Sequence, residues 1–231
     1  MGASGIGQSA VDLKMGNDFK SLYEIRFSES NDYRRKVWSI LVSDWFSRYI
    51  PTDASVLDLG CGYGQFINQV QARRRYAMDL NPDSMRSMEA DVQLFEQDCS
   101  TRWPLPDNHL DLVLASNFFE HLPSKSSLEA ALREAWRCLR PEGRIIALGP
   151  NIKYVDGAYW DYWDHHLPLT DSSMAEGFQL SGFRIEEKVA RFLPLTILNG
   201  PDYPLIFLRA YLRLPFVWPI FGQQYLVVAK K

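Results

Sequence analysis

The stretch VLDLGCGYG, residues 56–64, decides the fold of this chain. It continues a short apolar run that begins at Ala54, and such a run is typical of a parallel strand buried on both faces. Three glycines follow at alternate positions, Gly60, Gly62 and Gly64. Because glycine lacks a Cβ atom, the backbone can turn sharply there and approach a ligand closely. We therefore expect a buried strand that turns through the glycines into a helix over residues 63–72.

A carboxylate accompanies this turn. Asp79 follows Gly60 by 19 residues and ends the next expected strand, over residues 76–80. At that distance a carboxylate can accept hydrogen bonds from both hydroxyls of a ribose. An alternative remains open, because Pro82 begins a further helical segment and Asp79 could be only its cap.

Strands and helical segments alternate along the rest of the chain. Helices are expected over residues 23–50, 126–139 and 173–182. The last two begin with capping signatures, Ser126 with Glu129 and Ser173 with Glu176. Further strands are expected over residues 92–95, 110–115, 144–148, 183–192 and 224–229. This alternation implies right-handed crossovers and a mostly parallel sheet with helices on both faces, whose ligands bind at the carboxyl ends of the strands.

The composition indicates a globular chain without a strongly basic surface. The 231 residues suffice for one α/β domain, and 25 Lys and Arg against 28 Asp and Glu give a net charge of −3. Nucleic acid is not an expected partner, because a negative chain lacks the main driving force for binding a phosphate backbone. Wide spacing of the cysteines, Cys61, Cys99 and Cys138, argues against a disulfide framework and a CxxC metal site. With no secretory signal pattern near the start, we expect a cytoplasmic location.

These motifs together resemble the class I S-adenosylmethionine-dependent methyltransferases, over about residues 56–182. VLDLGCGYG is similar to their first motif, and Asp79 to their ribose acid. Asp98 with Cys99 resembles their adenine-edge loop, ASNFFEHLP (115–123) their fourth motif, and LRPEGRIIALGPN (139–151) the loop and strand that close the core. The resemblance implies a Rossmann-like fold: a seven-stranded, mostly parallel sheet with helices on both faces and an antiparallel last strand.

The resemblance also implies a cofactor, S-adenosylmethionine, with S-adenosylhomocysteine as its product. The glycine turn would line the methionine end, Asp79 the ribose, Asp98 the adenine amine and Asn117 the ammonium group. The expected cofactor-binding residues are Asp58, Gly60, Cys61, Gly62, Gly64, Asp79, Leu80, Asp98, Cys99 and Asn117. Carboxylates and backbone carbonyls suit a sulfonium with an amino-acid head better than a phosphate cradle would.

Two other roles share part of this pattern. A nicotinamide-dependent oxidoreductase has the same strand, turn and ribose acid, but its glycines fall as GxGxxG and not as GxGxG. Asp58, two residues before Gly60, would also place negative charge where a pyrophosphate binds. A non-catalytic module that keeps the cofactor fold is the second alternative, and the sequence leaves it open.

Three histidines are candidates for a catalytic base. His121 follows the expected strand 110–115, and His165 and His166 lie in the loop YWDYWDHHLPLT, residues 159–170. Imidazole titrates near neutrality, so it could take a proton from a hydroxyl, with Asp161 or Asp164 orienting it. A surface or packing role is the alternative for each histidine. Adjacent histidines are not at a metal-ligand spacing, so no metal is expected.

The aromatic residues of the same loop bear on the acceptor. Tyr159, Trp160, Tyr162 and Trp163 could form an apolar wall or a platform for a sugar ring, or could simply be core. We expect O-methylation of a small-molecule, sugar-like or lipid-linked acceptor, a glycan included. N- or C-methylation of a quinone or another small molecule is the alternative, since in-line positioning alone supplies much of the acceleration.

The chain is expected to comprise an N-terminal helical cap region, residues 1–50, and a methyltransferase domain, 51–231, with an apolar insertion at about 192–222. Prolines interrupt the insertion too often for a membrane-spanning helix of roughly 20 apolar residues. A short amphipathic helix could form from Ile206, Phe207, Ala210, Tyr211 and Leu214 with Arg209 and Arg213. A lid or a subunit contact, as in a homodimer, is the main interpretation, and peripheral contact with the inner face of a membrane is the other.

Overall fold

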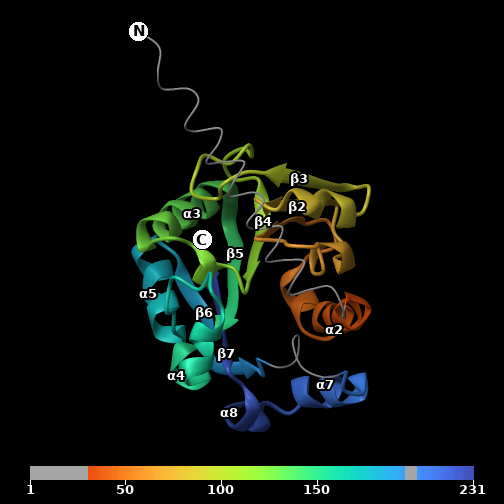
Figure 1. Ribbon diagram of the computed structural model, residues 1–231. Coiled ribbons are helices and arrows are strands. Elements are labelled where there is room, and N and C mark those ends of the chain that lie inside the picture. The colour runs from red at the N-terminus through yellow and green to blue at the C-terminus, as the bar shows by residue number, and fades with distance from the viewer. Residues whose placement is uncertain (1–30, 196–201) are drawn as a thin grey trace.

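The computed structural model describes residues 31–195 and 202–231, and a seven-stranded sheet forms its centre (Figure 1). The strands lie in the order β3-β2-β1-β4-β5-β7-β6. Neighbours from β3 to β5 are parallel, whereas β7 is antiparallel to both β5 and β6. The bounds are β1 Ser55–Leu59, β2 Arg74–Asp79, β3 Val92–Glu96, β4 Leu110–Ser116, β5 Leu139–Pro150, β6 Arg184–Leu193 and β7 Gln224–Lys230. The expected Rossmann-like sheet with an antiparallel last strand is confirmed.

The strand order places the functional motifs together. From β1 the chain moves outward to β2 and β3, and it then returns to the other side of β1 with β4. The loops after β1 and β4 therefore run in opposite directions from the carboxyl edge of the sheet, which is where ligands of such folds bind. The glycine turn follows β1, and the ASNFFEHLP segment spans the end of β4 and the loop after it.

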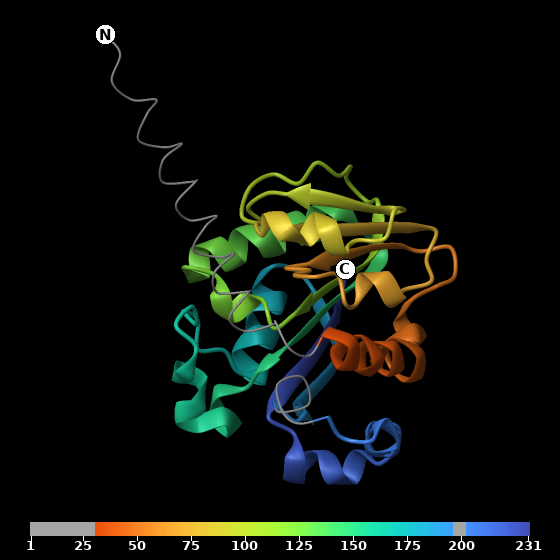
Figure 2. The same ribbon diagram turned by 45° about the vertical axis from the view of Figure 1, so that its right-hand side comes forward.

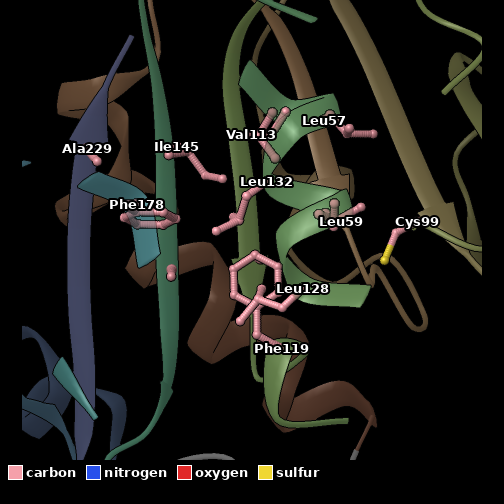
Figure 3. Close-up of a cluster of buried hydrophobic side chains, with 14 of the residues drawn as sticks. Leu57, Leu59, Cys99, Val113, Phe119, Leu128, Leu132, Ile145, Phe178 and Ala229 are labelled. Atoms are coloured by element: carbon pink, nitrogen blue, oxygen red, sulfur yellow. The ribbon is translucent and has the colours of Figure 1, made fainter. Parts of the chain in front are cut away.

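Helices cover both faces of the sheet (Figures 1 and 2). On one face lie α3 (Lys125–Cys138) and α5 (Asp171–Leu180), and on the other α2 (Asn31–Asp44) and α7 (Leu205–Leu212). Figure 3 shows Leu128 and Leu132 of α3 among the buried side chains on the face of the sheet that α3 and α5 cover. Alternate strand residues serve opposite cores, since successive side chains of a strand point to opposite faces: in β1, Leu57 joins the α3 side and Val56 the α2 side.

Shorter helices connect these elements. They are η1 (Phe46–Tyr49), η2 (Ile67–Gln69), η3 (Pro82–Ser87), η4 (Phe119–His121), α4 (Ile152–Val155), η5 (Asp156–Asp161), η6 (Pro215–Val217) and α8 (Trp218–Phe221). The helix expected over 23–50 is confirmed from Asn31 as α2 followed by η1, and its first residues lie outside the described part of the chain.

The expectation of a helix over 63–72 is wrong. This segment consists of turns and the single 3-10 turn η2. Phe66, Ile67 and Val70 are buried, so the apolar spacing that indicated a helix reflects anchoring of the turns in the core. The side chain of Asn68 competes with helical hydrogen bonding, because it donates to Ser87 O at 2.7 Å and accepts from the Glu89 N–H at 3.1 Å.

The two expected capping signatures are shifted. Ser124, not Ser126, is the N-cap of α3 and accepts a hydrogen bond from the Ser127 N–H at 3.1 Å. In α5 the cap is Thr170, which forms a reciprocal pair with Ser173. Neighbouring hydroxyls offer equivalent caps in the sequence, and the extended backbone of Ser124 and Thr170 decides between them.

The insertion forms α7, η6 and α8 beside α2. The short helix expected there forms as α7, Leu205–Leu212, and ends before Arg213 and Leu214. It buries Leu208 and Leu212, whereas Ile206 and Phe207 remain 65% and 64% exposed. Other large apolar side chains are also exposed here, namely Phe216, Ile220 and Phe221. Among the residues that the structure describes, no helix has the length and apolar character needed to cross a membrane.

Candidate active site

The glycine turn requires glycine at its centre. Gly60, Gly62 and Gly64 have φ values of +71°, +51° and +69°, in the left-handed region that favours glycine. A Cβ atom on Gly60 would lie 2.1 Å from the ring of Phe118, which belongs to the loop after β4. The Gly60 N–H donates to Met78 O at 2.8 Å, so the turn is also fixed to β2. Close packing of three segments thus shapes the turn.

A pocket of about 140 Å³ opens beside this turn. One wall is the turn itself with Asp58, a second is the end of β4 with Ser116 and Asn117, and α2 contributes Arg34 and Trp38. Asn117 is one of few non-glycine residues with a positive φ, +48°, and its N–H donates to Leu148 O at 2.7 Å. Strained backbone of this kind persists where surrounding structure fixes it, often at functional sites.

Asp79 belongs to the turn and does not cap the following helix. Its carboxylate accepts hydrogen bonds from the Gly62 N–H at 2.7 Å and the Asn81 N–H at 2.8 Å. The N-cap of η3 is instead Asn81, whose side chain accepts from the Asp83 N–H. Burial raises the pKa of Asp79, and the backbone N–H donors only partly offset this effect. Leu80, next in the chain, is an exposed apolar side chain at the same edge.

Asp58 is a second buried acid beside the pocket. It is 3% exposed, and burial together with the nearby Asp79 raises its pKa to about 8, against a lowering by the Ile67 N–H. A buried carboxyl of this kind favours a cationic neighbour, which would stabilise its charged form. The pocket thus offers an acid, Asp58, for a cationic group and a guanidinium, Arg34, for an anionic one.

Five of the expected cofactor residues do not line the pocket, namely Gly64, Asp79, Leu80, Asp98 and Cys99. Asp98 is exposed, and its side chain accepts from the Ser100 N–H at 2.8 Å. Cys99 is buried in the core on the α3 side, where burial raises the pKa of its thiol to about 12. Gly64 packs toward Met88.

The structure brings together two of the three expected histidines. The rings of His121 and His165 lie edge to face with centroids 4.8 Å apart. His121 Nδ1 is 3.1 Å from the Asp164 carboxylate, and His165 Nδ1 is 2.8 Å from Tyr159 O. His166 is exposed, and only its backbone N–H is seen to contact this group, donating to Glu120 O at 2.8 Å.

Electrostatics link His121 to Asp79. Burial alone lowers the pKa of His121, but the hydrogen bond to Asp164 and the charge of Glu120 outweigh it, so the pKa is raised. The charge of His121 in turn lowers the pKa of Asp79. His121 and Asp79 therefore influence each other electrostatically.

Glu120 is the residue that sequence reasoning missed. It lies in η4, is 2% exposed, and one ligand atom of each of Glu120, His121 and His165 lies within 4.8 Å of the others. Burial raises the pKa of its carboxyl to about 7, although His121 lowers it. The signal in the sequence was its position beside His121. Arg34 and Trp38 of α2 were also missed, because a helix before the first strand carries no motif.

The aromatic loop divides between core and surface. Tyr159 is buried, and its hydroxyl donates to Leu167 O. Tyr162 stacks on His165 with centroids 4.8 Å apart. Trp160 and Trp163 are 58% and 89% exposed. The loop thus contains one aromatic side chain packed in the core and two exposed ones.

Comparison with known proteins places this site in a known fold. Residues 57–147 match the family model described as a methyltransferase domain. An uncharacterized protein of Methanocaldococcus jannaschii is 28% identical over 137 residues, which are 58% of this chain and 56% of that relative. The matched part thus spans little more than half of that protein.

Two solved structures share the architecture. A SAM-dependent methyltransferase from Archaeoglobus fulgidus superposes with a TM-score of 0.66 at 22% identity, covering 92% of this chain and 100% of that one. The protein bound to the Trm112 methyltransferase activator of Haloferax volcanii superposes with a TM-score of 0.65 at 15% identity, covering 90% and 96%. At these identities the likeness is one of fold.

Proposed function

We propose that this chain, which carries a class I S-adenosylmethionine-dependent methyltransferase domain, transfers a methyl group to a hydroxyl of a small-molecule, sugar-like or lipid-linked acceptor. One observation carries the proposal: a partly buried imidazole pair, His121 and His165, includes a histidine, His121, that interacts electrostatically with Asp79, the acid hydrogen-bonded to the glycine turn. This interaction supports His121 as the candidate base of the proposed reaction.

The residues of the pocket fit the cofactor chemically. Arg34 supplies a guanidinium for the carboxylate of the methionine end, and Asp58 supplies an acid for its ammonium group. Asp79 would bind the ribose hydroxyls, and the exposed Leu80 would lie against the adenine. The buried Asp58 in the pocket lining and the partly buried Asp79 on the glycine turn would oppose a pyrophosphate, which argues against nicotinamide binding.

The proposed reaction needs one proton transfer from the acceptor. When bound, the cofactor supplies a methyl group on a sulfonium sulfur, so that an O–CH₃ bond forms as the S–CH₃ bond breaks and the thioether S-adenosylhomocysteine is released. Asp164 holds Nδ1 of His121. With Nδ1 protonated by this contact, Nε2 is the nitrogen that accepts the hydroxyl proton. Because a protonated hydroxyl is a weak nucleophile, this transfer supports catalysis at neutral pH.

The surroundings of the histidines support an acceptor with ring or apolar faces. Tyr162 stacks on His165, and Trp160 and Trp163 are exposed on the same loop. Aromatic side chains of this kind bind the faces of sugars and other rings. The exposed apolar side chains of α7 and α8 give a lipid-linked acceptor a further apolar surface.

Calorimetry with S-adenosylmethionine and with NAD, followed by an acceptor screen, tests the proposal. We expect binding of S-adenosylmethionine alone, and formation of S-adenosylhomocysteine with hydroxylated sugars, lipid-linked glycans or phenols. Mass spectrometry of the product then identifies the methylated atom. Binding of NAD in place of S-adenosylmethionine would reject the methyltransferase assignment, and a methylated nitrogen or carbon would reject only the choice of oxygen.

A further inference from the structure

Glu120, His121 and His165 form a set of donors that a metal ion can use. Each offers one ligand atom, and these three atoms lie within 4.8 Å of one another. The residues come from two segments, η4 and the loop after η5, which meet where the His166 and Leu167 N–H groups donate to Glu120 O. We propose that this cluster is a binding site for a divalent transition-metal ion such as zinc.

The hydrogen bonds of the two imidazoles prepare them as ligands. His121 Nδ1 lies 3.1 Å from the Asp164 carboxylate, and His165 Nδ1 lies 2.8 Å from Tyr159 O. A proton on each Nδ1 makes both contacts hydrogen bonds, and it leaves the electron pair on Nε2. Metal-binding histidines characteristically direct their other nitrogen to a carboxylate or a backbone carbonyl in this way.

The carboxylate of Glu120 is an independent reason for a ligand here. The residue is 2% exposed, and its Oε2 atom is buried without a hydrogen-bond partner among the described residues. A buried carboxylate oxygen with no partner is unfavourable, and a bound cation removes this penalty. Gly149 and Tyr225 pack close to this carboxylate. A Cβ atom added to Gly149 would lie 3.4 Å from Oε2 of Glu120 and 2.8 Å from the Tyr225 hydroxyl.

The donor set indicates the class of metal. Two imidazole nitrogens and one carboxylate oxygen suit zinc or iron, and in catalytic zinc sites three protein ligands leave a fourth position open. Calcium and magnesium prefer sites made of oxygen ligands. The sequence-based expectation of no metal considered His165 with His166, whereas the cluster pairs His165 with His121 from another segment.

A metal at this site would also have a role in the proposed methyl transfer. Only this role, and not the metal site itself, rests on the proposed function. An acceptor hydroxyl that occupies the open position would ionise more readily, since a bound cation lowers the pKa of an oxygen ligand. With the metal bound, Nε2 of His121 would be a ligand, so the metal would replace direct proton transfer to His121 as the means of activating the hydroxyl, and the proton would pass to solvent water. The methyl transfer itself is unchanged.

Zinc titration of the metal-stripped protein, without cofactor or acceptor, tests the site. We expect binding of one zinc ion by calorimetry, and cobalt(II) should give the visible absorption bands of a low-coordinate site with nitrogen ligands. Glu120→Gln and His165→Ala should each weaken zinc binding at least about 100-fold, and Asp164→Asn roughly 10- to 100-fold. The matched control is His166→Ala, which removes the exposed neighbouring imidazole and should leave the affinity unchanged.

The outcomes separate this proposal from the proposed function. Wild-type protein that binds no zinc, or Glu120→Gln and His165→Ala variants that bind it as the wild type does, would overturn the metal site. Circular dichroism verifies that each variant is folded, and the isosteric Glu120→Gln keeps the shape of the buried side chain. Titration of the same samples with S-adenosylmethionine reports on the cofactor pocket independently of the metal.

Discussion

Replacing Gly60 with alanine should destabilise the fold at the glycine-turn pocket. With φ at +71°, an L-residue at this position costs roughly 1 to 2 kcal/mol. The new Cβ atom would also lie 2.1 Å from the ring of Phe118, and relieving such an overlap in a packed core costs roughly 1 to 3 kcal/mol more. Together the two effects lower the free energy of unfolding by roughly 2 to 5 kcal/mol, a large part of the stability of a typical domain.

Urea denaturation followed by circular dichroism measures this loss, and Gly157→Ala is the matched control. A Cβ atom on Gly157 would meet no other atom within 4 Å, and the residue lies in the short helix η5, so its replacement should change stability by less than about 1 kcal/mol. In a Phe118→Ala background, Gly60→Ala should cost only its conformational part, roughly 1 to 2 kcal/mol. A loss as small as that of Gly157→Ala, or an equal loss in both backgrounds, would refute the packing argument.

Three further predictions concern charge and catalysis. Asp79→Ala should weaken S-adenosylmethionine binding by roughly 1.5 to 3 kcal/mol in calorimetry, through loss of charge-assisted hydrogen bonds, and an unchanged affinity would remove Asp79 from the site. The pKa of Asp58 is raised from 3.8 to about 8, so its contribution to stability is present below pH 3.8 and is lost as the pH rises to 8. Asp58→Asn should therefore make the melting temperature depend less on pH between pH 3.8 and 8. A melting temperature that varies with pH in the variant as it does in the wild type would contradict that burial effect. With the true acceptor, His121→Ala should lower turnover roughly 100- to 10,000-fold with cofactor affinity retained, whereas His166→Ala should keep most activity; the reverse result would move the base to His166.

The sheet could be predicted from the sequence because most of its strands are short apolar runs bounded by turn residues. All expected strands from residue 54 to residue 229 appear, and the strand that carries Asp58 is buried along its whole length. Local patterns were less reliable where several residues serve equally well. The hydroxyls near the start of α3 illustrate this, as Ser124 and Ser126 differ only in the backbone conformation that the fold imposes.

The site was predicted in its motif residues but not in its long-range neighbours. Gly62 and Asp79 meet as expected, since they lie at the carboxyl ends of the adjacent parallel strands β1 and β2. Arg34 reaches the pocket from α2, which precedes β1 in the chain, and no sequence motif surrounds it. The pairing of His121 with His165 in place of His166 depends on how a loop folds back over η4, which a sequence does not specify.

The position of β7 between β5 and β6 has a consequence for the order of assembly. Strands β1 to β5 form the parallel part of the sheet, and all of their residues lie before residue 151. In the described sheet, β6 has β7 as its partner, and β7 follows only after the α7 and α8 segment. On a ribosome, β6 must therefore wait with its hydrogen-bonding edge open until residues 224–230 emerge. The parallel part of the sheet can form first, and β7 then pairs with both β5 and β6 and so joins β6 to the sheet.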